Sequence, residues 1–450
     1  MFKILVNAWK IPELRKKILF TLFIILVFRF GSAIPVPFLD IGEAGIINAQ
    51  ESAGTFMEYL SMMTGNAFNY GTIFAMSITP YINSSIIMQL LTVAIPALER
   101  LQKEGEEGRK KIASITRWVT MILGTLQSTA YFFYLRNQGY LLTSTGGGAY
   151  TGFWAVFQAI AIIATFVGGT ALIMWLGEQI NDKGIGNGIS IILFAGIVSR
   201  IPTLLATLYS PTPGVGYIAR GGAFWVLSPL AGVILLLMIA FIVWMDNAER
   251  RIPVQYAKRV VGRKMYGGQS THIPIKVNMS GVMPVIFASS FLSLPPTIEL
   301  FVSNPSDRWK TFFSVFTSEH WAYTIIYFLF IIAFAYFYSS IQYNPVEMAN
   351  NIRKNSGAVP GLRPGKPTSD YIAKILSRIT LLGALLLSVI ALFPIVFSQV
   401  TKLITIGGVN YAMNISLGGT SIIIMVGVAL ETAKQLESQM MMRHYKGFLD

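Results

Sequence analysis

Residues 15–38 read Arg-Lys-Lys-Ile-Leu-Phe-Thr-Leu-Phe-Ile-Ile-Leu-Val-Phe-Arg-Phe-Gly-Ser-Ala-Ile-Pro-Val-Pro-Phe, a basic cluster followed by an apolar run. A helix rises about 1.5 Å per residue, so roughly 20 such residues cross a hydrocarbon core roughly 30 Å thick. The run leads into two prolines and carries no small-residue cleavage site of the kind that ends a signal peptide. We therefore expect it to be retained as the first membrane helix.

Nine more apolar segments of similar length follow. The ten lie near residues 18–38, 72–96, 118–135, 153–177, 188–208, 224–245, 281–300, 321–342, 375–397 and 412–433. Lys and Arg gather in the N-terminal tail and in every second connection, namely 98–117, 178–187, 246–280, 343–374 and 434–450. Because positive residues are retained on the cytoplasmic side of a membrane, this alternation predicts an all-α polytopic membrane protein with ten spans and both termini in the cytoplasm.

The composition excludes several classes of chemistry. Of the residues 53% are hydrophobic and 12% charged, against about 25% charged in ordinary soluble domains. The absence of cysteine excludes disulfides, thiolate metal sites and cysteine nucleophiles. The net charge of +14 falls in the cytoplasmic connections, where it can meet anionic lipid, an acidic protein or RNA.

Ionisable groups are scarce inside the predicted spans. The three histidines lie in loops or the tail, and no Asp or Glu sits in the middle of a span. Proton-coupled transporters need such relays, and no nucleotide-binding loop is present either. We expect no enzyme activity, no cofactor and no metal, with transport driven by a partner. Arg29 is the exception within a span, and it either lines a pathway or caps carbonyls in the bundle.

The ten spans divide into two halves, 1–212 and 213–450, joined by the Pro/Gly-rich link 209–216. Each half holds five spans, an odd number, so two related halves would insert upside down relative to each other. The second span of each half carries a similar motif, Ile78-Thr-Pro-Tyr-Ile82 and Val282-Met-Pro-Val-Ile286. Proline interrupts a helical hydrogen-bond ladder, and matching interruptions in inverted halves point to a central pathway.

Residues 54–71, before the second span, look helix-capable but are too short and polar to cross a membrane. Backbone that does not span is tolerated at membrane depth only when it is buried in protein or lines water. The segment is therefore either re-entrant in an outer vestibule or an interfacial helix on the outer surface.

Two basic connections suit docking of a partner. Connection 246–280, in which we expect a projecting hairpin, carries Arg250, Arg251, Lys258, Arg259, Arg263 and Lys264. Connection 343–374 holds Val359-Pro-Gly-Leu-Arg-Pro-Gly365, a stiff turn that presents Arg363 at a fixed place. An acidic partner such as ribosomal RNA would suit both, although positive-inside topology alone would also explain the charge.

These residues resemble the SecY family, the central subunits of the bacterial protein-conducting channel, over essentially the whole chain. The resemblance rests on Phe28-Arg-Phe-Gly31, Pro80-Tyr-Ile-Asn-Ser-Ser-Ile-Ile-Met-Gln-Leu-Leu91, Trp175-Leu-Gly-Glu-Gln-Ile180, Gly184-Ile-Gly-Asn-Gly-Ile-Ser190, Arg250-Arg-Ile-Pro-Val-Gln-Tyr-Ala-Lys-Arg259, Gln269-Ser-Thr-His-Ile-Pro-Ile-Lys-Val-Asn278, Pro360-Gly-Leu-Arg-Pro-Gly365 and Gly418-Gly-Thr-Ser421. Each string is weak alone, and together they are specific.

The resemblance implies an hourglass pore whose halves open around the central link. Its waist would be an aliphatic ring of Ile78, Ile82, Ile189, Leu193, Ile286 and Ile424, with leucine at 193 where relatives use isoleucine. Such a ring repels water and ions yet slides around a polypeptide. By the same resemblance residues 54–71 form a plug, with Phe56, Tyr59, Leu60, Met62, Met63 and Phe68 as its apolar side chains. Helices 2, 3, 7 and 8 would form a lateral gate, with Asn83 and Gln127 as its polar contacts.

The family also implies the partners. They are small membrane subunits resembling SecE and SecG, a motor ATPase resembling SecA, the ribosome, signal sequences and nascent chains, at the bacterial inner membrane. The hairpin and Arg363 would be the docking sites. The expected activity is translocation of unfolded secretory polypeptides and sideways release of apolar segments into lipid. A secondary transporter for a small solute also suits inverted halves, whereas a structural scaffold would leave the paired Pro-x-Ile motifs unexplained.

Overall fold

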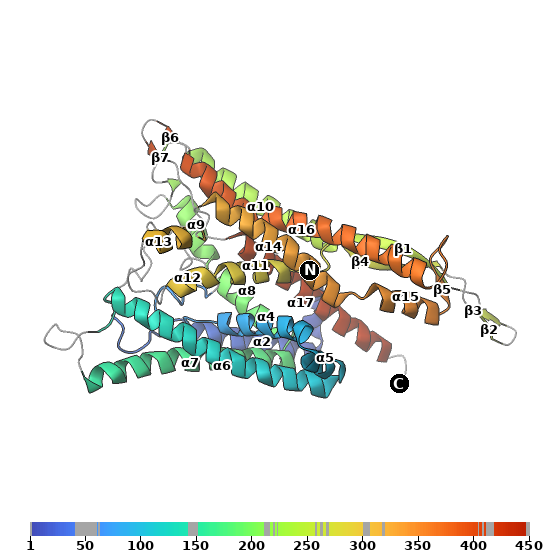
Figure 1. Cartoon of the computed structure of the whole chain (residues 1–450), viewed down its shortest axis with the longest axis horizontal. Coiled ribbons are helices and arrows are strands. Elements are labelled where there is room, and N and C mark those ends of the chain that lie inside the picture. The colour runs from blue at the N-terminus through green and yellow to red at the C-terminus, as the bar shows by residue number, and fades with distance from the viewer. Residues whose placement is uncertain are drawn as a thin grey trace.

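The chain is a bundle of helices that carries a small sheet at one end (Figure 1). This computed structural model describes residues 2–40, 61, 64–142, 152–210, 217–218, 221–222, 224–256, 259–261, 264–266, 270–299, 307–316, 320–403, 405–406, 409–410 and 418–446. Each of the ten apolar segments contains a helix. These helices are α2 (Pro12–Gly31), α4 (Thr79–Ala94), α6 (Glu106–Asn137), α7 (Phe153–Lys183), α8 (Gly188–Val198), α9 (Ile201–Tyr209), α10 (Phe224–Asn247), α11 (Met283–Leu292), α12 (Leu294–Glu299), α14 (Trp321–Gln342), α16 (Lys366–Leu403) and α17 (Gly419–Lys446).

Not every helix is itself long and apolar enough to cross a membrane. By length and composition, five spans among the described residues meet that standard, or six if the bent pair α4 and α5 (Pro96–Lys103) counts as one. The fold is thus that of a polytopic helical membrane protein, and the count of ten spans stays a prediction. The remaining helices are α1 (Phe2–Lys10), α13 (Asp307–Ser314) and α15 (Pro345–Lys354).

Several helices run well past the apolar segments that predicted them. α6 begins at Glu106 although its apolar stretch begins near residue 118, and α16 begins at Lys366 although its apolar stretch begins near 375. The extra turns of α6 are mostly exposed, with Gly108 and Thr116 buried. On α16 they bury Thr368, Ser369 and Ile372, and so extend the helix beyond the depth of a membrane.

The two matching prolines begin helices, contrary to the expectation that they interrupt them. α4 is capped at Ile78 and α11 at Val282, which places Pro80 and Pro284 in the first helical turn. Proline is tolerated there because the first N–H groups of a helix have no intrahelical acceptor. The sequence match is real, but it marks two helix starts inside the molecule.

The segments that lead into these two helices are anchored in the same way. Ile73 lies seven residues before Pro80, and its N–H donates to the carbonyl of Ile34, just past α2, at 3.0 Å. Val277 lies seven residues before Pro284, and its N–H donates to the carbonyl of Ala248, just past α10, at 2.9 Å. The residues just past α2 and α10 therefore anchor the backbone that leads into α4 and α11.

The carbonyls of the same two residues rest on glycines. A Cβ at Gly169 of α7 would fall on the carbonyl oxygen of Ile73, and a Cβ at Gly383 of α16 would fall on that of Val277. Glycine is needed at both places because only a residue without a side chain allows the backbone to approach so closely.

Helix packing follows one scheme in both halves. In the first, α4 packs on α6, α6 on α7, α7 on α8, and α2 on α7 and α8. In the second, α11 packs on α14, α14 on α16, α16 on α17, and α10 on α16 and α17. Figure 1 shows α2, α4, α6 and α7 on one side of the molecule and α10, α14 and α16 on the other.

The expected projecting hairpin is present. β1 (Glu249–Tyr256) and β4 (Ser270–Lys276) pair antiparallel with Glu249 opposite Lys276, and the short strands β2 (Arg259–Val261) and β3 (Lys264–Tyr266) pair beyond them. The sequence did not predict a third strand, β5 (Gly357–Ala358), which pairs with Gln255 and Tyr256 of β1. It joins the two basic connections into one sheet. A further small pair, β6 (Thr405–Ile406) and β7 (Val409–Asn410), lies at the other end of the molecule (Figure 1).

Candidate functional site

A cavity of about 1170 Å³ lies between the two halves. Its walls come from α4, α7 and α8 of the first half and from α10, α11, α14, α15, α17 and the residues around β4 of the second. Five of the six predicted ring residues line it: Ile82, Ile189, Leu193, Ile286 and Ile424. Helices from both halves thus bring together side chains that are far apart in the sequence.

The sixth ring residue, Ile78, does not line this cavity. It is the residue directly before α4, one turn before Ile82. Its side chain is 1% exposed and belongs to the same buried hydrophobic cluster as Ile82. None of the described cavity-lining residues comes from the stretch Thr64–Ile78. The cavity therefore extends from the aliphatic side chains toward the end of the molecule that bears β1 and β4, hereafter the hairpin end.

The stretch Thr64–Ile78 leads into α4 from the far side of these aliphatic residues. Phe68, predicted to belong to a plug, is buried with its ring 4.3 Å from that of Tyr131 on α6. The Tyr131 hydroxyl also donates a 2.6 Å hydrogen bond to the carbonyl of Phe68. Residues 64–71 form turns rather than a helix, since Gly65, Asn66 and Gly71 have positive φ. The other plug residues, Phe56, Tyr59, Leu60, Met62 and Met63, lie outside the described residues.

Arg29 has a definite contact. It lies two residues before the C-terminus of α2, and its Nη1 donates to the carbonyl of Gly65 at 3.3 Å. A cation is favoured in the last turn of a helix by the helix dipole. The guanidinium thus ties α2 to the segment that carries Phe68. This matches the carbonyl-capping alternative for Arg29.

The two predicted gate residues, Asn83 on α4 and Gln127 on α6, are half-buried, and no hydrogen bond joins them in the described structure. The helices α4 and α6 run antiparallel. A Cβ at Gly124 of α6 would lie 3.9 Å from Pro80 of α4, so these two residues lie at the same level along the helices. Asn83 lies three residues past Pro80, toward the hairpin end, and Gln127 lies three residues past Gly124, away from that end. The two residues are therefore about 9 Å apart along the helix axes. The Asn83 Oδ1 is buried with no hydrogen-bond partner among the described residues.

The predicted docking residues gather at the hairpin end. Arg250 and Arg251 are exposed on β1, where Arg251 pairs with Glu249 at 2.7 Å. Arg259 begins β2 and Lys264 begins β3, so the backbone brings them to the tip of the hairpin. Lys258 and Arg263 lie outside the described residues.

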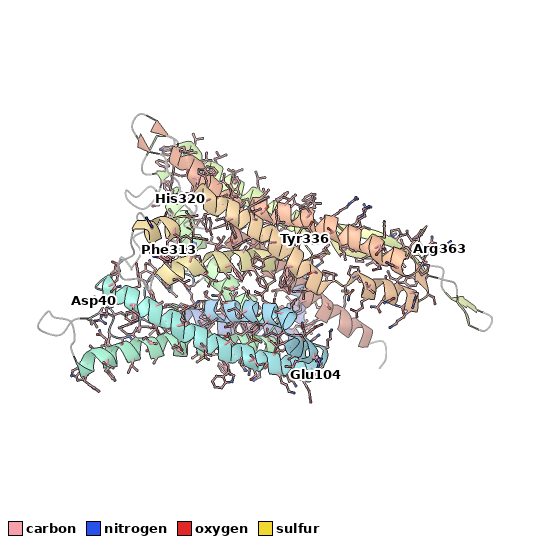
Figure 2. All side chains as sticks on the ribbon, viewed as in Figure 1. Asp40, Glu104, Phe313, His320, Tyr336 and Arg363 are labelled. Carbon is pink, nitrogen blue, oxygen red and sulfur yellow. The ribbon has the colours of Figure 1, made fainter. Side chains whose placement is uncertain are left out.

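Arg363 projects at the same end (Figure 2). Its side chain is exposed and forms no hydrogen bond or ion pair with any described residue, while its carbonyl accepts a 2.9 Å bond from the Thr368 hydroxyl. Gly361 and Gly365 on either side have φ of 81° and 114°, which fixes the turn. The turn stands on a small core that includes Ile252, Val254 and Val359.

Sequence reasoning missed the charged residues of the cavity wall. Asp246, Lys276, Glu431 and Lys434 all line it, and all four belong to the second half. The described lining residues of the first half are neutral, and the polar ones are Tyr81, Ser85, Gln89, Asn181, Asn187 and Ser190. No motif marks these positions. Only the shared face of α17 that also carries Ile424 could have indicated them, because Glu431 follows Ile424 by two helical turns.

Sequence comparison identifies relatives along the whole chain. The family model described as SecY matches residues 72–433. A protein translocase subunit SecY from Streptomyces griseus is 43% identical over 451 residues, covering 100% of both chains. The protein of the same name from Mycobacterium bovis is 40% identical over 459 residues, again covering 100% of both.

Comparison with solved structures gives the same fold. A structure described as a protein conducting channel matches with a TM-score of 0.58 at 17% identity, covering 96% of each chain. Sec61 in the canine ribosome-channel complex matches with a TM-score of 0.57 at 16% identity, covering 96% of each. From the match to the family model and the identity to full-length relatives, the chain belongs to the SecY family.

Proposed function

We propose that this protein is the channel subunit of a protein translocase, and that it passes unfolded polypeptide between its two halves. The observation that carries the proposal is the set of five aliphatic side chains from both halves that lines one cavity. A constriction without hydrogen-bonding groups excludes water and ions and offers a moving chain nothing to bind. The relatives of similar length are named as protein translocase subunits, in agreement with this role.

A secondary transporter for a small solute is the weaker candidate. Such a protein needs a polar substrate site near the middle of the membrane, whereas the predicted ring residues that line the cavity are isoleucine and leucine. The relatives also favour the channel.

The described part of the predicted plug, residues 64–71, acts as the stopper on the outer side of the ring. Packing of Phe68 on Tyr131 and hydrogen bonds at the carbonyls of Gly65, Phe68 and Gly71 hold this segment in place. In a structurally similar SecY protein, the plug domain stabilises the closed state of the channel.

Apolar segments leave sideways between α4 and α6 on one side and α11 and α14 on the other. Asn83 and Gln127 are the polar groups of this gate. A hydrogen bond of such a group is worth roughly 1 kcal/mol in a membrane, so Gln127→Leu should shift the gate and relax the signal requirement. Unchanged export of precursors with defective signals would remove Gln127 from this role.

The hairpin end faces the cytoplasm of a bacterium, with both termini on that side of the inner membrane. Its unpaired Arg363 and basic strands suit an acidic docking partner: the ribosome with its RNA, or a SecA-like motor ATPase. The remaining partners are SecE-like and SecG-like subunits and anionic lipid. The chain itself supplies the conduit and not the energy.

The test places a photo-crosslinking amino acid at Ile82 or at Ile286 and stalls a labelled secretory precursor halfway across. The lipid-facing control is Leu236, which is 69% exposed on α10. Crosslinks from both ring positions and none from Leu236 are expected. Export of the precursor without a crosslink from either ring position would place the path elsewhere and return the solute transporter to consideration.

A further inference from the structure

The tryptophans of this chain all lie on its surface. The sequence has eight, all of them among the described residues, and each side chain is between 46% and 72% exposed. Tryptophan is on average a well-buried residue in soluble proteins. In membrane proteins it is enriched where the bilayer meets water, because its ring is apolar and its N–H needs a polar partner. The eight exposed side chains therefore mark the two interfaces of a membrane.

Two helices carry a tryptophan near each end and so give the distance between these interfaces. Trp154 and Trp175 of α7 are 21 residues apart, and Trp225 and Trp244 of α10 are 19 residues apart. At about 1.5 Å per residue these separations are about 32 and 29 Å, and the hydrocarbon core of a bilayer is about 30 Å thick. Trp244 lies five residues before β1, so one interface is toward the hairpin end. The other is at the opposite end, hereafter the outer end.

Four of the tryptophans belong to the outer end: Trp154, Trp225, Trp309 and Trp321. Three of them lie in the first two residues of helices that are long and apolar enough to cross a membrane, namely α7, α10 and α14. Trp309 differs, because α13 has only eight residues and lies in the connection between α12 and α14. α13 contacts α12. Figure 2 shows Phe313 of α13 at the same end of the molecule as His320, the residue before Trp321. α13 therefore lies at the outer interface.

One face of the segment that contains α13 carries all of its aromatic residues, with the i, i+3, i+4 and i+7 spacing of an amphipathic helix: Trp309, Phe312, Phe313 and Phe316. The remaining residues of α13 are polar or charged. Phe313 is 3% exposed, and Phe316 packs against the large buried cluster that contains Ile82. This part of the aromatic face attaches α13 to the helix bundle.

The other part of the aromatic face is uncovered. Trp309 is 55% exposed and Phe312 is 49% exposed. Each exposed ring rests on an inner ring, since the centroid of Trp309 lies 5.6 Å from that of Phe313, and the centroid of Phe312 lies 5.3 Å from that of Phe316. The inner rings thus hold the outer rings in place on the surface. The neighbouring helices continue this apolar surface, because Ile298 of α12 is exposed as well.

We propose that α13 is an interfacial helix that inserts Trp309 and Phe312 into the outer leaflet, where the lipid headgroups meet the acyl chains. Helices of this kind lie in the plane of the interface, with the apolar face about 5–10 Å into that boundary. The partner of this surface is the lipid bilayer itself. The connection between α12 and α14 is then held at the membrane surface, together with the outer ends of both helices.

The test measures the depth of α13 in a bilayer. The chain contains no cysteine, so a nitroxide can be attached at Trp309→Cys or at Phe312→Cys, both of which replace exposed side chains. The assembled translocase is placed in nanodiscs of phosphatidylethanolamine and phosphatidylglycerol. Collisions of the nitroxide with oxygen, which concentrates in the bilayer, are compared with collisions with a water-soluble nickel complex. The bilayer reference is Leu236→Cys, exposed near the middle of α10, and the water reference is Asn350→Cys, exposed on α15 at the hairpin end.

Nitroxides at both positions of α13 should collide more often with oxygen than with the nickel complex, at a depth of about 5–10 Å within the boundary of headgroups and acyl chains. Nickel access equal to that at Asn350 would place α13 in water and overturn the proposal. Low access to both reagents would mean that protein covers this face, which would overturn it equally. The measurement needs no translocation, so its outcome is independent of the crosslinking test of the channel.

Discussion

The segments that lead into α4 and α11 are built alike but differ in what they carry. The N–H groups of Ile73 and Val277 donate to backbone carbonyls just past α2 and α10, respectively. The carbonyls of the same two residues rest on glycines of α7 and α16. The five helix pairings of the two halves also correspond. We propose that the halves are an inverted repeat in which this anchored backbone is the conserved structural element.

The difference lies in the residues attached to the two anchors. In the first half the anchored stretch contains Phe68, packed on Tyr131 on the side of the ring away from the cavity. In the second half it contains Asn278, on the wall of the cavity. One scaffold thus carries an apolar segment, the proposed stopper, on one side of the predicted ring and polar groups on the other. The comparison suggests that the scaffold sets the position of the ring, and the attached segments determine what reaches it.

The largest expected effect comes from the second half alone. Arg363→Glu should reduce motor-driven translocation about tenfold or more, because a like charge placed against an acidic partner costs several kcal/mol in docking. The matched control is Arg136→Glu, which alters an exposed residue near the C-terminus of α6. Translocation into vesicles measures both variants. Normal activity of Arg363→Glu in a folded complex would contradict the docking role.

The shared anchor can be broken in both halves. Gly169→Val and Gly383→Val should each lower the free energy of unfolding by about 1–3 kcal/mol, because the new side chain meets a backbone carbonyl. Gly168→Val is the matched control, since a Cβ there has nothing within 4 Å. Thermal unfolding in detergent measures all three. Similar melting temperatures for Gly168→Val and Gly169→Val would disprove the anchor in the first half.

The smallest expected effects separate satisfied from unsatisfied polar groups. In the second half Ser339 of α14 shares a 2.9 Å hydrogen bond with Thr380 of α16, and Ser339→Ala should cost about 0.6 kcal/mol. In the first half Asn83→Leu should cost nothing or stabilise the protein, because the Asn83 Oδ1 has no described partner. The same melting experiment distinguishes the two. A larger loss for Asn83→Leu than for Ser339→Ala would contradict this assignment.

The sequence predicts the helices well because each apolar segment has a length fixed by the membrane. It predicts helix ends poorly, because α6 and α16 begin with polar turns that lie before their apolar segments. The two-residue strand β5 has no periodicity to detect, and its partner is a hundred residues earlier in the chain. The sequence shows both prolines, but it does not show whether each one lies in the first turn of a helix or in its middle.

The candidate site divides in the same way. Family strings predict the aliphatic ring, and five of its six predicted members line one cavity. They could not show that Ile78 stands apart from this cavity at the cap of α4, since that depends on where the helix begins. Asn278 and Glu431 line one cavity only because α17 lies beside the segment before α11, a tertiary contact without a local signal.

The claim that polypeptide passes between the halves at the ring is tested most directly by joining the halves there. The chain contains no cysteine, so Ile82→Cys with Ile286→Cys introduces two unique thiols on α4 and α11. Linking them with a short, cleavable bifunctional thiol reagent should stop translocation, and cleaving the linker should restore it, while either single variant stays active. Translocation at the normal rate through a fully linked channel would contradict passage between α4 and α11.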